Sequence, residues 1–215
     1  MIRETKDCGT EEMNNKNRIG SMPSALRQSG IEVTEFSSDS LKLTELTGLA
    51  MARLHRRPGP AGKQNGLFDL PEQTGQARGN DPSVLCLRPG EWLFVSDKTG
   101  AANLVRHVTA VGGEGAAVYD NSEGLAVFRL SGAGGPWLLS KLSGLDFLAG
   151  RSAGEHCTRT KMGHVAVVIH YHRAGDGAFV FDLVFDRSLA RYLWELLLAS
   201  APHADDLAGA YGTAA

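Results

Sequence analysis

The chain has 215 residues, of which 42% are hydrophobic and 21% are charged, and its 22 basic and 24 acidic residues give a formal net charge of −2. This balance excludes the strongly basic character expected of a protein that binds nucleic acid or anionic lipid. The three cysteines, Cys8, Cys86 and Cys157, have no CxxC spacing, which argues against a disulfide framework and against a zinc ribbon.

Residues 1–30 have few large apolar side chains and no sustained period, so we expect a flexible arm. This segment lacks the apolar core of a signal peptide, and no window of the chain reaches the roughly 18 apolar residues of a membrane span. We therefore expect a cytoplasmic protein that does not bind membranes. Residues 31–200 are predicted to form one domain, and residues 201–215 a flexible tail.

The first part of this domain is irregular. The leucines of residues 31–54 fit either alternating strands or a short helix. Residues 58–82 are rich in Gly and Pro and predict a long loop with one apolar anchor, formed by Leu67, Phe68 and Leu70.

Regular elements begin at Val84. Two β-rich runs, VLCL and EWLFVS, lie on either side of Arg88-Pro89-Gly90 and predict a hairpin. A helix is predicted over 97–111, where the pair Gly112-Gly113 ends it. The runs AAVYD and GLAVFRL predict two strands, and residues 136–145 a helix with Ser131 as its N-cap.

The last third of the domain predicts two strands and a helix. A long strand is expected over 160–172, followed by a turn at Gly175-Asp176-Gly177 and the strand AFVFDLVF. An amphipathic helix is expected over 187–200. Its expected buried stripe consists of Leu189, Tyr192, Leu193, Leu196 and Leu197.

From Glu91 the order is strand, helix, strand, strand, helix, strand, strand, helix. The first six elements have the split βαβ order of a ferredoxin-like α+β sandwich, and the last two extend and cover its sheet.

Three histidines are candidate site residues. His164, His170 and His172 share one face of the predicted strand, and the apolar residues between them take the opposite, core-facing side. A zinc-sized ion would need a further ligand from another element, and none is adjacent in the sequence. A polar strip that faces solvent or a partner is the better interpretation.

Other motifs carry less chemistry. Gly132-Ala133-Gly134-Gly135 follows a strand but lacks the βαβ context of a dinucleotide site, and the glycines of 112–115 follow a helix. Cys157 beside His156 could suggest a thiolate pair, but neighbours on a strand point to opposite faces, which favours an ordinary buried cysteine.

Asp182 lies within an apolar run, where an unpaired carboxylate is costly, and Arg129 is its natural partner by residue type. The three tryptophans, Trp92, Trp137 and Trp194, are interpreted as core or interface anchors. Trp194 lies about 100° around the helix axis from Leu193, at the margin of the stripe, which favours a partner contact.

Four strings carry a family resemblance: PGEWLFVS, YDNSEGLAVFRLSGAGGPWLLSKLSGLDF, HCTRTKMGHVAVVIHYH and FVFDLVFDRSLARYLWELLLAS. Together they resemble the gamma subunit of heterotetrameric sarcosine oxidase over about 85–200. The resemblance implies a fold similar to the folate-binding domains of the glycine-cleavage T-protein type. None of the strings is a catalytic signature.

The resemblance implies a non-catalytic accessory subunit of an oxidoreductase that acts on sarcosine or another N-methyl or secondary amino acid. It implies alpha, beta and delta subunits as partners, with FAD, FMN, NAD and tetrahydrofolate carried by them and no cofactor, metal or catalytic residue on this chain. Trp194, His164, His170 and His172 are the expected interface residues. Two alternatives remain: a free-standing folate-binding, aminomethyltransferase-like protein, and a ferredoxin-like sensor of small ligands.

Overall fold

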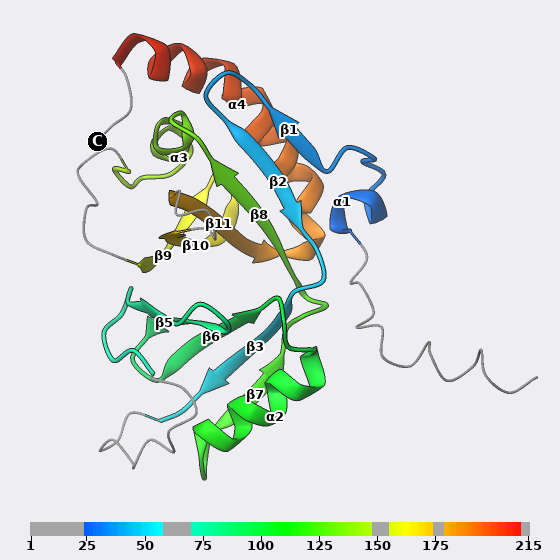
Figure 1. The fold of residues 1–215 in the computed structure, drawn as a ribbon, viewed down its shortest axis with the longest axis vertical. Coiled ribbons are helices and arrows are strands. Elements are labelled where there is room, and N and C mark those ends of the chain that lie inside the picture. The colour runs from blue at the N-terminus through cyan, green and yellow to red at the C-terminus, as the bar shows by residue number, and fades with distance from the viewer. Residues whose placement is uncertain (1–23, 58–69, 148–154, 174–178, 212–215) are drawn as a thin grey trace, which may run out of the picture.

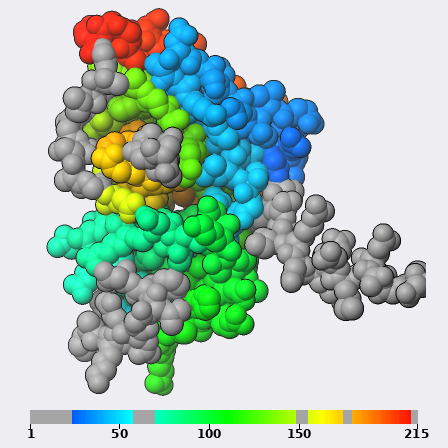
Figure 2. All heavy atoms as spheres, in the orientation of Figure 1, coloured from blue at the N-terminus to red at the C-terminus, as the bar shows by residue number. Residues whose placement is uncertain are grey.

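A computed structural model of the chain describes residues 24–57, 70–147, 155–173 and 179–211. Its strands form two antiparallel sheets that are stacked one above the other, with helices on their outer sides (Figure 1). The space-filling view shows these sheets and their helices as two halves that meet across the middle of the molecule (Figure 2). Among the described helices, none is long and apolar enough to cross a bilayer.

The six-stranded sheet has the order β1-β2-β8-β11-β10-β9. Its strands are β1 (Glu35–Ser37), β2 (Lys42–Leu46), β8 (Leu125–Ser131), β9 (His156–Met162), β10 (Val165–Arg173) and β11 (Phe179–Asp186). Three α-helices and a 3-10 turn accompany it: α1 (Ala25–Gln28), α3 (Gly135–Leu142), η1 (Arg187–Leu189) and α4 (Ala190–Tyr211).

The five-stranded sheet has the order β4-β5-β6-β3-β7. Its strands are β3 (Ala50–His55), β4 (Ala77–Arg78), β5 (Ser83–Arg88), β6 (Glu91–Ser96) and β7 (Ala117–Asp120), and α2 (Ala101–Gly112) covers it. One apolar core lies between this sheet and α2, where Leu54, Phe94 and Leu104 are buried.

Alternation along each strand separates two further cores. On β8, Phe128 and Leu130 face the core under α3 and α4, whereas Val127 faces the other sheet. Val127 and Val184 there meet Met51 and Leu93 of the five-stranded sheet. The molecule is therefore a four-layer arrangement of helices, sheet, sheet and helix.

The α+β class predicted from the sequence is confirmed. The structure differs from the prediction in that these elements form two sheets and not one. Strands β6 and β7, with α2, belong to the five-stranded sheet, whereas β8 and the later strands, with α3, belong to the six-stranded sheet. The ambiguous segment 31–54 supplies the strands that make this division: β2 pairs with β8, and β3 pairs with both β6 and β7.

The packed chain begins earlier and ends later than predicted. Helix α1 lies within the expected arm, and Leu26 on it is completely buried in the core under α4. At the other end, α4 continues through Pro202 to Tyr211 and buries Ala204 and Ala208. Residues 1–23 and 212–215 lie outside the described residues.

The expected strand over 160–172 is two strands. β9 ends at Met162, Gly163 adopts a positive φ of 56°, and β10 begins at Val165 as the antiparallel partner of β9. A single glycine with a positive φ is enough to reverse the chain here. In the Gly/Pro-rich segment 58–82, Leu70 is buried as expected and β4 is an additional short strand, while Leu67 and Phe68 lie outside the described residues.

Candidate functional site

A polar row crosses the middle of the six-stranded sheet, on the face toward the other sheet. The registers place Arg129 of β8 opposite Asp182 of β11, and Asp182 opposite His170 of β10. His172 lies two residues further along β10, on the same face. The apolar residues that alternate with these side chains, including Phe128, are buried on the opposite face. Strand alternation thus brings four chemistry-bearing residues together.

Arg129 binds Asp182 with two parallel hydrogen bonds. Nε donates to Oδ1 and Nη2 donates to Oδ2, both at 2.7 Å. Burial acts to raise the pKa of Asp182, but the hydrogen bonds from Arg129 and His172 outweigh it and lower the pKa to about 2. Asp182 is therefore an ionised carboxylate at any physiological pH. The pairing that residue types suggested is confirmed.

His172 bridges the carboxylate and the backbone. Its Nε2 lies 2.7 Å from Oδ2 of Asp182, and its Nδ1 lies 3.0 Å from the carbonyl oxygen of Arg173. Burial acts to lower the pKa of His172, but the interaction with Asp182 outweighs it and raises the pKa. Both neighbouring oxygen atoms are acceptors, so each ring nitrogen of His172 faces its partner as a donor.

His170 is the buried member of the group. Its side chain stacks on His172 with ring centroids 4.3 Å apart. Only 4% of the residue is exposed, and its Nε2 has no hydrogen-bond partner among the described residues. Burial, followed by the repulsion of His172, lowers the pKa of His170 to about 3. His170 is thus a neutral imidazole with an unused polar atom.

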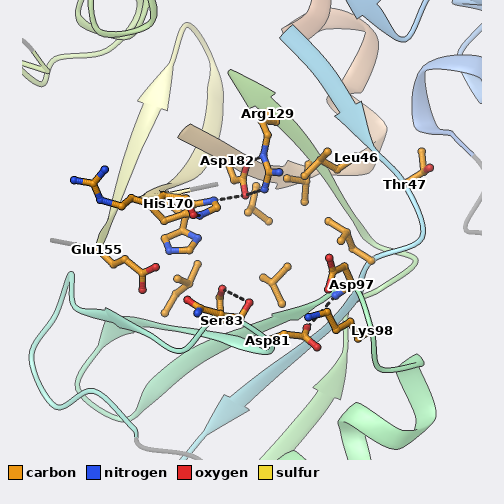
Figure 3. Close-up of a pocket in the computed structure, with 18 of the residues that line it drawn as sticks. Leu46, Thr47, Asp81, Ser83, Asp97, Lys98, Arg129, Glu155, His170 and Asp182 are labelled. Carbon is orange, nitrogen blue, oxygen red and sulfur yellow. Dashed lines mark hydrogen bonds and ion pairs between the residues drawn. The ribbon is translucent and has the colours of Figure 1, made fainter. Parts of the chain in front are cut away.

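This group forms part of the wall of a cavity of about 950 Å³ between the two sheets. Figure 3 shows Arg129, Asp182 and His170 on one side of it and Asp81, Ser83, Asp97 and Lys98 on the other. The volume is that of a small-molecule site. Its lining is mixed, with apolar side chains such as Val127 and Val184 between the charged groups.

The structure brings some of the predicted site residues together and separates others. His170 and His172 lie together at the cavity wall. His164 does not join them, because it lies in the β9–β10 turn, where it is exposed and its ring centroid is 6.5 Å from that of Tyr192. The histidines have no third ligand adjacent in the sequence, but the structure supplies Asp182 from the neighbouring strand. Only the register between β10 and β11 reveals it.

The interpretation of Trp194 as an interface anchor is wrong. Trp194 is 2% exposed and packs edge-on against Phe128, with ring centroids 5.3 Å apart. The buried side of α4 is rotated from the predicted stripe. Leu193 and Trp194 are both in the core, whereas Tyr192 of α4 and Leu189, at the end of η1, are exposed.

Cys157 has the environment of an ordinary buried thiol. It is 4% exposed, and burial raises its pKa to about 12. Its Sγ points toward the carbonyl oxygens of Gln76 and Cys86, while the His156 ring lies against Tyr171. The two neighbours therefore face opposite ways, as strand geometry predicted.

The glycines of 132–135 serve close packing. A Cβ atom on Gly132 would lie 2.2 Å from the carbonyl oxygen of Ser40, and one on Gly134 would lie 2.4 Å from the Ser40 hydroxyl. Gly134, rather than the predicted Ser131, is the N-cap of α3 and makes no side-chain cap. The approach of the β1–β2 connection explains these glycines without a phosphate.

Comparisons with known proteins establish the fold. No protein-family model matches the sequence, and no curated protein matches it. Among solved structures, a chain of the heterotetrameric sarcosine oxidase from Corynebacterium sp. U-96, in complex with pyrrole 2-carboxylate, is similar with a TM-score of 0.69 and 19% identity. The match covers 84% of this chain and 95% of that chain.

The glycine cleavage system aminomethyltransferase T from Bartonella henselae is also similar, with a TM-score of 0.50 and 15% identity. That match covers 74% of this chain but only 45% of the aminomethyltransferase. The fold expected from the family resemblance is therefore confirmed.

Proposed function

We propose that the chain is the accessory, gamma-type subunit of a heterotetrameric sarcosine oxidase-type flavoenzyme. Its likeness to a chain of such an oxidase over 95% of that chain's length is the observation that carries the proposal. The fold alone does not determine function, but the extent of the match favours a counterpart of one subunit. The substrate class proposed is sarcosine or a related N-methyl or secondary amino acid.

The chemistry of the oxidase is assigned to the partners. In this proposal the alpha, beta and delta subunits carry FAD, FMN, NAD and tetrahydrofolate, and this chain contributes no catalytic residue. The raised pKa of Cys157 supports this division, because a protonated thiol is a poor nucleophile. The close packing at Gly132 and Gly134 supports it too, since it accounts for the glycine-rich turn.

The exposed side of α4 is the proposed contact with the flavin-bearing partners. Tyr192 exposes 41% of its surface there, and Leu189, the last residue of the preceding 3-10 turn η1, exposes 39%. Tyr192 lies beside His164, the one expected interface residue that is exposed, and Gly163 closes the turn against the Tyr192 ring. An aromatic ring with a hydroxyl at its edge is a common anchor of protein interfaces.

Isolation of the native complex through this chain tests the proposal. We expect one species in which flavin-bearing subunits co-elute, with visible flavin absorbance and turnover of a secondary amino acid. Tyr192→Asp should weaken assembly by roughly tenfold or more. The matched control is Tyr119→Asp on the edge strand β7, since Tyr119 is 55% exposed on the other sheet. A chain that never assembles with a flavoprotein contradicts the proposal.

The cavity between the sheets favours a second candidate, a free-standing folate-binding protein. Its volume of about 950 Å³ suits a ligand of that size, and the aminomethyltransferase shares the fold. Equilibrium dialysis of the isolated chain against tetrahydrofolate separates the two candidates. Saturable binding of one equivalent without any partner supports the folate-binding role, and its absence supports the accessory role.

A further inference from the structure

We propose that His170, His172 and Asp182 form a binding site for a divalent transition-metal ion, with Zn²⁺ as the best match. Each residue offers one ligand atom, and these atoms lie within 4.8 Å of one another. The site goes beyond the proposed function and does not depend on assembly with partners.

The three ligands are held by a rigid scaffold. His170 and His172 are two residues apart on β10, and Asp182 is the register partner of His170 on β11. Zn–N and Zn–O bonds of about 2.0–2.2 Å place tetrahedral ligand atoms roughly 3.4 Å apart. The two stacked imidazoles must therefore rotate about their side-chain torsions, and Nε2 of His172 must move away from Oδ2 of Asp182, when an ion binds. Two imidazoles and one carboxylate with an open position are the ligand set of many accessible zinc sites.

The unused nitrogen of His170 is an independent indication of a ligand. Its Nε2 is buried and has no hydrogen-bond partner among the described residues. The side chain lines the cavity, whose volume of about 950 Å³ leaves room for a bound ligand. Buried polar atoms are rarely left unsatisfied, because they have lost their hydrogen bonds to water. A metal ion bound between the two histidines would satisfy it.

His172 has the outer contact that orients a metal-binding imidazole. Its Nδ1 donates to the carbonyl oxygen of Arg173 at 3.0 Å, which leaves Nε2 as the coordinating atom. Ligating histidines usually donate their second ring N–H to a carbonyl or carboxylate in this way. The distance of 2.7 Å from Nε2 to a carboxylate oxygen is that of a hydrogen bond donated by a ring N–H, and a metal ion would replace this proton.

The ion pair with Arg129 is compatible with such a site. An ionised carboxylate has about four acceptor positions, and Arg129 uses one on each oxygen of Asp182. A metal ion would take the position on Oδ2 that His172 now uses. Arg129 would then remain as the hydrogen-bonding partner of a ligating carboxylate, as is usual around metal ions.

The charge of the cavity favours a dication. Its lining includes five carboxylates, those of Glu45, Asp81, Asp97, Glu155 and Asp182. Three cationic side chains offset them, Lys98, Arg129 and Arg173, and His172 adds a positive charge when both of its ring nitrogens are protonated. When a metal ion replaces one of these ring protons, five acidic groups face three basic ones, and this formal charge of −2 favours a divalent ion.

Calorimetric titration of the full, untagged, chelator-treated chain with Zn²⁺ tests this site. We expect one equivalent to bind, and Co²⁺ to give visible absorption bands of a coordinated ion. His170→Asn and His172→Asn should each lower the affinity by about 100-fold. The matched control is His164→Asn, which removes an exposed imidazole from the turn of the same hairpin and should leave the affinity unchanged.

Circular dichroism of each variant checks its fold, and the wild-type chain supplies a second measurement. Saturating Zn²⁺ should raise its melting temperature, because a ligand that binds only the folded state stabilises it, whereas Mg²⁺ should not. The proposal is overturned if Zn²⁺ neither binds saturably nor raises the melting temperature. Unchanged binding in both His170→Asn and His172→Asn, or its loss in His164→Asn, also overturns it.

Discussion

Arg129 and Asp182 are joined across the β8–β11 ladder by two parallel hydrogen bonds of 2.7 Å. Asp182 is buried, whereas a third of the Arg129 side chain is exposed. The pair lies at the edge of the apolar contact between the two sheets, where Val127 and Val184 flank it on the same strands. An ionised carboxylate can remain at this position because a cation and an imidazole share its charge.

Arg129→Ala should lower the free energy of unfolding by about 3 kcal/mol, because it leaves a buried carboxylate without its main partner. Adding Asp182→Asn to this variant should recover part of the loss. Urea denaturation measures both values. The control is Arg191→Ala, whose ion pair with Glu195 is exposed on both sides and should contribute about 0.5 kcal/mol or less. Equal effects of the two arginine variants would contradict this prediction.

Local patterns predicted the buried sides of the strands correctly. In β10 the apolar positions Val167 and Ile169 face the helices while His170 faces the other sheet, as a period of two requires. The Arg129–Asp182 pair followed from the cost of burying an unpaired carboxylate. These features depend on single strands or on residue type, so they need no knowledge of topology.

Features that depend on long-range pairing could not be predicted. The division into two sheets rests on strands from a segment whose pattern fitted either a helix or strands. The third member of the His170 and His172 group, Asp182, lies on the next predicted strand, and only the register between β10 and β11 places it opposite His170. In α4, Leu193 and Trp194 differ by about 100° around the axis, and a broad buried arc includes both.

Trp194→Ala should lower the free energy of unfolding by about 3–5 kcal/mol, since it removes a large side chain from the core and its contact with Phe128. Tyr192→Ala, on the exposed side of the same helix, should cost about 1 kcal/mol or less. Thermal and urea unfolding of the isolated chain measure both. If Trp194→Ala left the isolated chain as stable as Tyr192→Ala, the assignment of Trp194 to the core would fail.

Leu26→Ala should lower the free energy of unfolding by about 2–4 kcal/mol, because Leu26 of α1 is fully buried under α4. The short helix is further fixed by Glu45, whose Oε1 accepts a hydrogen bond of 2.6 Å from the backbone N–H of Ala25. Val33→Ala is the control, since Val33 is 62% exposed and should change stability by about 0.5 kcal/mol or less. If Leu26→Ala left the free energy of unfolding unchanged, residues 24–30 would belong to the flexible arm and not to the packed domain.

Asp205 connects the last turns of α4 to the β1–β2 connection. Its Oδ1 accepts hydrogen bonds from the Ser38 hydroxyl at 2.9 Å and the Ser40 backbone N–H at 3.1 Å, and also from the Ser40 hydroxyl. Burial acts to raise the pKa of Asp205, but the hydrogen bonds from Ser40 and Ser38 outweigh it and lower the pKa below 3.8. The ionised form is therefore favoured in the folded chain.

Asp205→Asn should lower the free energy of unfolding at pH 7 by about 1 kcal/mol, because hydrogen bonds to a charged acceptor are stronger than those to an amide. A carboxylate whose pKa is lower in the folded chain stabilises it fully above the unfolded pKa of 3.8, and this contribution is lost as the pH falls through the folded pKa. The difference between wild type and Asp205→Asn should thus close in acid. Asp206→Asn, at the exposed neighbouring position, is the control and should change the free energy of unfolding at pH 7 by about 0.5 kcal/mol or less. Urea unfolding measures both variants at pH 7 and follows Asp205→Asn into acid. A difference that persists unchanged in acid would mean that the shape of the side chain, and not its charge, holds the end of α4 in place.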